Sequence, residues 1–266
     1  MKDIKEITQK LEEGIQKVFT STEYIKYLNV MSKFHHYSFG NCMLILSQKP
    51  DASLVAGYKS WQKNFKRQVK RGEKGITILA PMPRSYKVVN EETGEEEEHK
   101  YTAYHAVTVF DISQTDGEEL PKYGAKELVG DVKQYRAFIK ALKGVAKVPV
   151  HIKEIDGEER GYCAKNEIVI KKGMSELQTI KTLIHEVAHN LLGHVGSTES
   201  RTTCEVEAES VAYVVSQYFG LDTSEYSFPY IAGWAGESDK KVIQRVLGNI
   251  QKTADCIIKG CESAVA

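Results

Sequence analysis

Residues 182–190 read Thr-Leu-Ile-His-Glu-Val-Ala-His-Asn, and the H-E-x-x-H pattern within them constrains the chain more than any other feature. Helical residues four apart lie on one face, so His185 and His189 can bind one metal ion. Glu186 can reach a water on that metal and act as its general base. Zinc held by two imidazoles and a carboxylate lowers the pKa of its bound water to about 7. The pattern is therefore typical of a zinc-dependent metallopeptidase.

The alternative to a metal site is a surface helix with two spare histidines, because five letters with two free positions are a weak motif. The flanking sequence favours the metal site. A broad apolar face surrounds the histidines and predicts a buried helix: Leu183, Ile184, Val187, Ala188, Leu191 and Leu192. A strand-like run at 167–170 precedes the helix, and a peptidase of this kind lays its substrate along a sheet edge beside the site helix.

A second helix supplies carboxylates that can complete the site. Glu205 and Glu209 share a face, so one can bind the metal while the other holds a ligand histidine through its free ring nitrogen. Two acidic residues four apart, after the H-E-x-x-H helix, resemble the pattern of gluzincin-type proteases. The resemblance implies that Glu205 binds the metal and Glu209 supports a ligand, but the reverse assignment of the two stays open. We expect Glu207 to be solvated. His194 does not match the metzincin spacing and is not expected as a ligand, and Gly193 is expected to end the first helix.

Composition limits the other classes of function. The 266 residues carry 36 basic and 36 acidic side chains, so no global field recruits nucleic acid, and any such binding needs a local patch. No apolar run approaches the length of a transmembrane helix, and the N-terminus lacks the apolar core of a signal peptide. The five scattered cysteines indicate thiols in a reducing compartment. We expect a cytoplasmic protein with no membrane partner.

The pattern of elements predicts an α+β protein of two domains, 1–118 and 119–266. In the first we expect helices at 3–19, 21–30 and from about 38 to Pro50, a strand at 55–58, a helix at 59–69, a strand at 76–81, and a hairpin of 86–89 with 101–111. A linker at about 113–130 leads to a helix at 132–145, a strand at 148–152, a hairpin of 160–164 with 167–170, the two site helices, and a last helix at 238–259. The aromatic loop 226–234 can line a cleft or fill the core.

A basic stretch between Lys59 and Lys74 holds seven basic residues and one acidic residue, interleaved with Trp61 and Phe65. A run of charge is usually a solvated helix face, and that alternative stays open. Cations for phosphates and rings for base stacking are, however, what a groove for single-stranded nucleic acid needs. The stretch therefore predicts a local site for single-stranded DNA.

Motifs in both halves together resemble the ArdC-type antirestriction family, including LtrC-like proteins of mobile elements. The N-terminal motifs are Tyr37-Ser38-x-x-Asn41-x-x-Leu44-Ile45-x-x-Gln48-x-Pro50, Val55-Ala56-Gly57-Tyr58-Lys59-x-Trp61, Lys70-Arg71-Gly72-Glu73-Lys74-Gly75-Ile76 with Ala80-Pro81, and Val109-Phe110-Asp111-Ile112-x-Gln114. The C-terminal motifs are Gly161-Tyr162, the 182–189 run and Glu205-x-x-Ala208-Glu209. Cys163 departs from the pattern, because a second aromatic residue is expected there.

The resemblance implies an N-terminal single-stranded-DNA-binding domain, a C-terminal zincin-like metallopeptidase domain, and protection of incoming plasmid DNA from restriction enzymes. With the basic stretch, it places the DNA contacts at Tyr37, Asn41, Lys59, Trp61, Lys63, Lys66, Arg67, Lys70, Arg71 and Lys74.

We therefore predict Zn²⁺ on His185, His189 and Glu205, with Glu186 passing the water proton to the leaving amine of a protein substrate that the sequence does not identify. Tyr213 and His194 are the candidates for stabilising the oxyanion. Two other readings stay open: a DNA-binding antirestriction protein with a non-catalytic metal site, and a cytoplasmic zinc peptidase whose N-terminal half binds protein.

Overall fold

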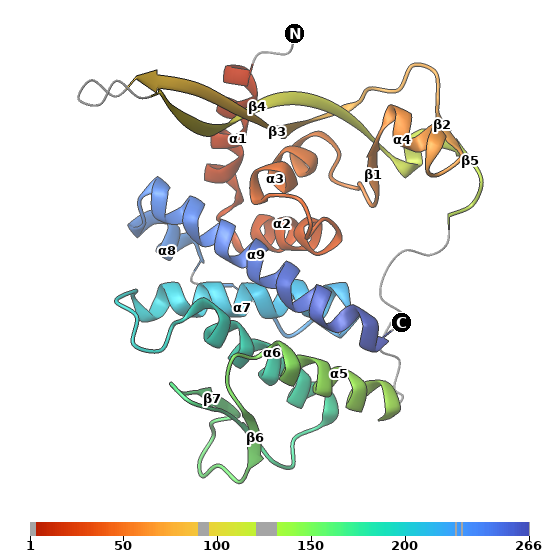
Figure 1. Cartoon of the computed structure of the whole chain (residues 1–266). Coiled ribbons are helices and arrows are strands. Elements are labelled where there is room, and N and C mark those ends of the chain that lie inside the picture. Colours follow the sequence, from red (N-terminus) through yellow and green to blue (C-terminus); the bar gives the residue numbers. More distant parts are fainter. Residues whose placement is uncertain (1–3, 90–95, 121–131, 227, 230, 266) are drawn as a thin grey trace. The chain divides into compact units, whose positions relative to one another are not determined.

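The computed structural model (Figure 1) describes residues 4–89, 96–120, 132–226, 228–229 and 231–265. The chain divides into two compact units. The first unit comprises Met1–Gln16 and Met43–Glu119, and the second comprises Lys17–Cys42 and Leu120–Ala266. The expected division at 118/119 lies beside one of these boundaries, whereas the segment 17–42 joins the C-terminal half of the chain and not the N-terminal half.

The first unit is built on a three-stranded antiparallel sheet of order β1-β4-β3. Its elements are most of α1 (Ile4–Val18), the end of α3 (Phe39–Gln48), β1 (Val55–Gly57), α4 (Tyr58–Lys63), β2 (Arg67–Val69), β3 (Ile76–Val89), β4 (Glu96–Asp111), the 3-10 turn η1 (Ile112–Gln114) and β5 (Thr115–Gly117). Strands β2 and β5 form a separate antiparallel pair. Ile76, Ile78 and Val109 lie on one face of this sheet and are buried.

Three predictions for this unit are corrected. The helix expected at 59–69 ends at Lys63, because Lys66 has a left-handed φ of 52° and the next residues pair with β5. The strands expected at 76–81 and 86–89 are one continuous strand, β3, which pairs with β4 along its whole length. The expected linker 113–130 begins with η1 and β5, and its residues 121–130 lie outside the described part of the chain.

A buried carboxylate organises the end of β4. Asp111 accepts hydrogen bonds from the backbone N–H groups of Ser53 at 2.7 Å and Leu54 at 3.1 Å, and from that of Ser113 at 2.9 Å. The Asp111 N–H donates in turn to the side chain of Gln114 at 2.9 Å. Burial alone would raise the pKa of Asp111, but these hydrogen bonds to the charged form outweigh it and lower the pKa. The Asp111 and Gln114 positions of the sequence motif therefore hold the strand end in place.

The second unit is mostly helical, with a small sheet of order β6-β8-β7. Its elements are α2 (Ser21–Lys33), the start of α3, α5 (Val132–Val145), β6 (Val150–Lys153), β7 (Gly161–Cys163), β8 (Ile168–Lys171), α6 (Glu176–Leu192), α7 (Arg201–Tyr218), α8 (Ile231–Glu237) and α9 (Lys240–Val265). The central strand β8 is parallel to β6 and antiparallel to β7, and its apolar residues are buried. These bounds confirm the expected helix at 132–145 and the hairpin of β7 and β8.

Helix α2 belongs to this unit because its side chains bond to α7. The Tyr24 hydroxyl lies 2.8 Å from Ser210 Oγ, and Tyr213 donates its hydroxyl to Asn29 Oδ1 at 2.9 Å. Tyr24 is fully buried. Within the described residues, no helix combines the length and the apolar character needed to cross a membrane.

Candidate metal centre

Helix α6 carries the H-E-x-x-H residues and has defined ends. Ser175 caps its start by accepting from the N–H of Gln178 at 3.2 Å. Gly193 ends it with a left-handed φ of 72°, which confirms the expected cap. The reversal returns the chain so that the N–H of His194 donates to the carbonyl of His189 at 3.1 Å. The turn therefore brings His194 back beside the second histidine of the pattern.

Two histidines of α6 and one carboxylate of α7 converge on one point. Nε2 of His185 lies 3.0 Å from Nε2 of His189. The Glu205 carboxylate lies 3.6 Å from His185 Nε2 and 3.8 Å from His189 Nε2. The donor atoms of the three residues all lie within 4.8 Å of one another, so together they can hold a metal ion. Two imidazoles and a carboxylate form the donor set that suits zinc and several other divalent metals.

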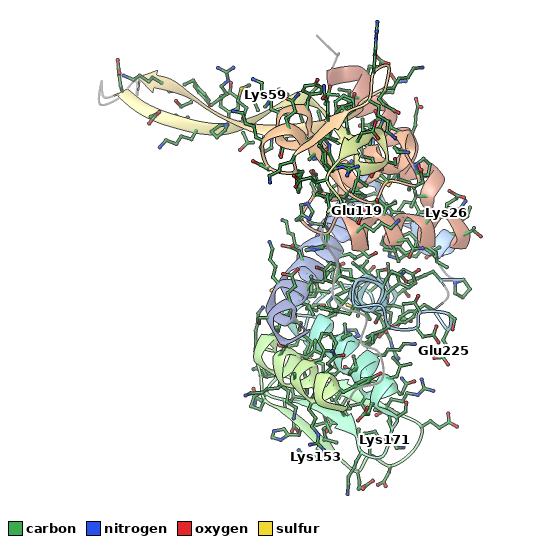
Figure 2. The ribbon with its side chains drawn as sticks, turned by 90° about the vertical axis from the view of Figure 1, so that its right-hand side faces the viewer. Lys26, Lys59, Glu119, Lys153, Lys171 and Glu225 are labelled. Atoms are coloured by element: carbon green, nitrogen blue, oxygen red, sulfur yellow. The ribbon has the colours of Figure 1, made fainter. Side chains whose placement is uncertain are left out.

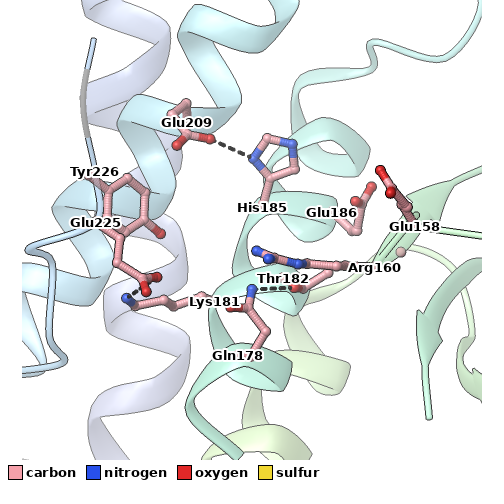
Figure 3. A pocket seen from close by; sticks show the side chains of 11 residues that line it. Glu158, Arg160, Gln178, Lys181, Thr182, His185, Glu186, Glu209, Glu225 and Tyr226 are labelled. Carbon is pink, nitrogen blue, oxygen red and sulfur yellow. Dashed lines mark hydrogen bonds and ion pairs between the residues drawn. The ribbon is translucent and has the colours of Figure 1, made fainter. Parts of the chain in front are cut away.

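Glu209 lies on the opposite side of the His185 ring. Its Oε2 is 3.4 Å from His185 Nδ1, the contact drawn as a dashed line in Figure 3. Burial alone would lower the pKa of His185, but the hydrogen bond to Glu209 and the nearby carboxylates raise it. The structure thus places Glu205 with the converging Nε2 atoms and Glu209 behind His185. This placement is the one expected if Glu205 is a ligand and Glu209 its support, as the gluzincin-like order implied.

His189 is held by a buried chain of side chains. Its Nδ1 lies 2.8 Å from His194 Nδ1, and His194 Nε2 lies 2.9 Å from Glu207 Oε2. Asn249 of α9 donates to the other oxygen of Glu207 at 2.8 Å. The expectation that Glu207 is solvated is wrong: the residue is 2% exposed, and its burial is tolerated because both oxygens are hydrogen-bonded.

The same surroundings keep the His189 imidazole neutral. Its burial, followed by the nearness of His185 and His194, lowers its pKa to about 3. A neutral imidazole is the form that donates to a metal. The two candidate ligand histidines thus have different supports: a carboxylate contacts His185 directly, and a carboxylate contacts His189 through a third histidine.

Glu186 lies on the side of α6 that borders a cleft. It is buried, and this burial, with Glu205 and Glu159 nearby, raises its pKa to about 7 against the opposing effect of His185. The cleft has a volume of about 460 Å³ and is lined by Glu158, Arg160, Gly161, Gln178, Lys181, Thr182, His185, Glu186, Glu209, Glu225 and Tyr226. Figure 3 shows Arg160 extending below His185, and Glu186 beside Glu158.

Neither candidate for oxyanion stabilisation lines this cleft. The Tyr213 hydroxyl donates a hydrogen bond to Asn29, and both ring nitrogens of His194 are hydrogen-bonded to other side chains. Sequence reasoning missed Arg160, and also Lys181, a buried amine 5.4 Å from the ring centre of Tyr226. The position of Lys181, one helical turn before His185, was a usable signal.

The residues expected to contact DNA separate into groups. Tyr37 and Asn41 belong to the second unit, and Asn41 is buried. In the first unit, five of the expected cations have exposed side chains: Lys59, Lys63, Lys66, Arg71 and Lys74. Lys66 lies 3.5 Å from the Glu118 carboxylate. Lys70 is also exposed, but it bonds to the Ser113 carbonyl at 3.1 Å and lies 3.6 Å from Asp116.

Two of these residues have structural roles. Trp61 is fully buried and donates its ring N–H to the Phe110 carbonyl at 2.9 Å, so the prediction that it stacks on DNA bases is corrected. Arg67 donates to Thr115 Oγ1 and to the Thr115 carbonyl, each at 2.8 Å, and also to the Gly117 carbonyl at 3.2 Å. Its guanidinium thereby fastens β2 to β5.

Comparison with known proteins relates the N-terminal part of the chain to a family. Residues 2–110 match the ArdcN model, the N-terminal domain of anti-restriction factor ArdC. An uncharacterized protein of Bacillus anthracis is 29% identical over 99% of this chain, which covers 52% of that protein, so the chain spans about half the length of this relative.

Two crystal structures of the antirestriction protein ArdC from plasmid R388 have a similar fold. The metal-free structure aligns with a TM-score of 0.53 at 23% identity, covering 85% of this chain and 84% of the other. The Mn(II)-bound structure aligns with a TM-score of 0.50 at 21% identity, covering 84% of each. These matches confirm the ArdC-type resemblance and the mixed α+β fold.

Proposed function

We propose that this ArdC-like protein, with an ArdC-type N-terminal domain over residues 2–110, is an antirestriction factor that binds single-stranded DNA and carries a zincin-like metallopeptidase domain. The observation that carries the proposal is the convergence of His185, His189 and Glu205 beside Glu186, which borders an open cleft. The family match supports the antirestriction role. The function would serve a mobile genetic element by protecting incoming DNA.

The donor set of the metal centre supports zinc, and the Mn(II)-bound ArdC structure supports a divalent ion more generally. When bound by His185, His189 and Glu205, the metal supplies a Lewis acid for the scissile carbonyl and lowers the pKa of a water. Glu209 and the His194–Glu207 pair hold the two imidazoles through their Nδ1 atoms, so that both Nε2 atoms face the same point.

The remaining groups of the cleft act on the substrate. Glu186 takes a proton from the attacking water on its carboxylate and delivers it to the nitrogen of the leaving amine. Arg160 has no ion pair among the described residues, and its N–H groups are available to the carbonyl oxygen as negative charge develops there. Edge strand β7 offers its outer side to an extended peptide, with Gly161 in the cleft wall.

The exposed cations of the first unit support the nucleic-acid partner. Lys59, Lys63, Arg71 and Lys74 can each neutralise a phosphate, and displacing the counterions of the nucleic acid would make its binding weaken as salt rises. A cytoplasmic site of action follows from the antirestriction role.

The rival function is DNA occlusion by a protein whose metal site is structural. Glu186 argues against it, because a structural metal site does not need an unliganded carboxylate facing a cleft. A second rival is a peptidase whose first unit binds protein and whose lysines are only solvated.

The test compares the full-length wild type with Glu186→Gln, both loaded with zinc, using casein as an unfolded probe and cells carrying a restriction system. We expect the variant to keep its metal and to cleave casein about 10²- to 10⁴-fold more slowly than the wild type. If neither protein cleaves casein and both still protect DNA from restriction, the peptidase proposal is wrong and DNA occlusion is the function. Absent binding to single-stranded DNA at low salt would favour a protein-binding first unit.

A further inference from the structure

Strands β3 and β4 continue past the sheet of the first unit as a two-stranded ribbon (Figures 1 and 2). We call the part from Ala80 to Val89, paired with Glu96 to His105, the arm. Strand β1 pairs with β4 only at Val109–Asp111, so no third strand of the described sheet borders the arm. The described side chains at 83–88 and 98–102 are exposed, so both faces of the outer part of the arm are accessible.

The register assigns the side chains of the arm to two faces. Arg84 lies opposite Tyr101, and Tyr86 lies opposite His99, so these four residues share one face, which we call the aromatic face. Tyr104 pairs with Pro81 and lies on the other face. The aromatic face is the outward continuation of the face that buries Ile76 and Ile78 in the sheet.

Two tyrosine rings on the aromatic face are open to solvent. Tyr86 is 55% exposed and Tyr101 is 51% exposed. The Tyr86 ring stacks on His99 with centroids 5.5 Å apart and meets Tyr101 edge-on at 5.9 Å. Beside Tyr101, a surface hollow of about 410 Å³ is lined by Pro83, Arg84, Ser85, Lys100, Tyr101 and Thr102. The rings thus form a supported platform next to a hollow.

The charges of the two faces differ. On the face opposite the rings, Lys87 pairs with Glu96 at 2.6 Å and Lys100 lies 3.9 Å from Glu98, so carboxylates neutralise those lysines. On the aromatic face, Arg84 has no ion pair among the described residues. Four of the five cross-strand pairs of this face, from Ala80–His105 to Tyr86–His99, contain no acidic residue, and the fifth and outermost pair, Val88–Glu97, contains one. Around the two rings this face therefore presents an arginine without a carboxylate in the neighbouring pairs.

We propose that the aromatic face of the arm binds single-stranded nucleic acid, with bases stacking on Tyr86 and Tyr101 and Arg84 contacting a phosphate. The chemistry is specific to unpaired strands, because the bases of a duplex have their faces covered by their neighbours. The inference rests on the proposed binding of single-stranded DNA and gives it a location. It also supplies rings for stacking, which buried Trp61 does not.

The test measures fluorescence anisotropy of labelled oligothymidine with the full-length protein and three single variants, Tyr86→Ala, Tyr101→Ala and Tyr104→Ala. Tyr104 is the matched control, because it lies on the same strand as Tyr101 and is 53% exposed, but its side chain is on the opposite face. Replacing either tyrosine by alanine lowers the intrinsic β-strand propensity of the strand by the same amount. Each lost stacking contact is worth about 1–3 kcal/mol, so Tyr86→Ala and Tyr101→Ala should each raise Kd between about 5-fold and 150-fold. Tyr104→Ala should stay within about twofold of wild type.

A salt series adds a second readout. Arg84→Ala should reduce the slope of log Kd against log salt by about 0.7, the amount expected for one lost phosphate contact to a single strand. The Tyr86→Ala and Tyr101→Ala variants should leave this slope unchanged. Circular dichroism melts check that each variant is folded.

The outcomes separate the inference from the function it rests on. If wild type binds oligothymidine and all three tyrosine variants bind equally well, the arm is not the site, while binding elsewhere stands. If a blunt duplex competes as well as the single strand, stacking is not the mode of recognition. If wild type binds no oligonucleotide at low salt, the proposed DNA binding itself fails, and the face is left as a surface for a protein partner.

Discussion

The metal centre and the arm present functional side chains in opposite ways. In the centre, His185 contacts Glu209, and His189 is held through His194 by Glu207, which is 2% exposed. On the arm, Tyr86 and Tyr101 are more than half exposed and rest on neighbours of the same ribbon. Metal ligands must be fixed in position and tautomer, which takes buried partners. A surface that accepts any base needs only open rings on a firm backbone.

The largest effect should come from a buried ring in the same unit as the open ones. Trp61→Ala removes a fully buried side chain and its hydrogen bond to the Phe110 carbonyl, so the free energy of unfolding should fall by about 3–5 kcal/mol. Tyr101→Ala, an exposed ring, should change it by about 0.5 kcal/mol or less. Urea denaturation of both variants measures the difference. Equal losses would mean that the arm tyrosines are part of the core.

An intermediate effect should come from a residue of the centre that is not a ligand. Glu207→Gln keeps the size of the side chain but removes the charge that holds His194 against His189, so zinc affinity should fall about 10- to 100-fold. Glu199→Gln is the control, because Glu199 is a partly exposed carboxylate that pairs with Arg245 at 2.9 Å. Calorimetric titration with zinc measures both variants. Unchanged affinity in Glu207→Gln would show that the buried chain does not support the ligand.

The smallest effect should come from the ion pair of the arm. Lys87 and Glu96 lie 2.6 Å apart, with their side chains 70% and 57% exposed. Exposed pairs contribute between zero and about 1 kcal/mol, so Lys87→Ala should lower the free energy of unfolding by no more than that, and by less at high salt. Thermal melts at two salt concentrations test this. A larger loss would mean that the arm is held by its charges and not by its backbone pairing.

Local sequence predicted the features that depend on neighbouring residues. The spacing of His185 and His189, the cap at Gly193 and the hairpin of β7 and β8 follow from patterns within a few residues. The support of His189 could not be read this way. Glu207 is buried because Asn249, 42 residues further along the chain, bonds to it from another helix.

From the sequence, two separate strands were expected at 76–81 and 86–89, where the structure has the single strand β3. Pro81 and Pro83 interrupt the strand pattern between them. Proline lacks a backbone N–H and is tolerated where a strand has no partner on one side. Strand β3 is the edge of the order β1-β4-β3, so both prolines fit without breaking it. Trp61 was misassigned because its partner is remote in sequence: the ring is buried and donates its N–H to the Phe110 carbonyl, 49 residues further along the chain.

The central claim is that α6 and α7 form one metal site in which Glu205 is the ligand and Glu209 is the support. Anomalous diffraction from zinc-soaked crystals of the full chain tests it most directly. The account predicts one strong peak at about 2.0–2.2 Å from Nε2 of His185, Nε2 of His189 and a carboxylate oxygen of Glu205. A peak bound by Glu209 in place of Glu205, or no peak between these helices with zinc in excess, would contradict it.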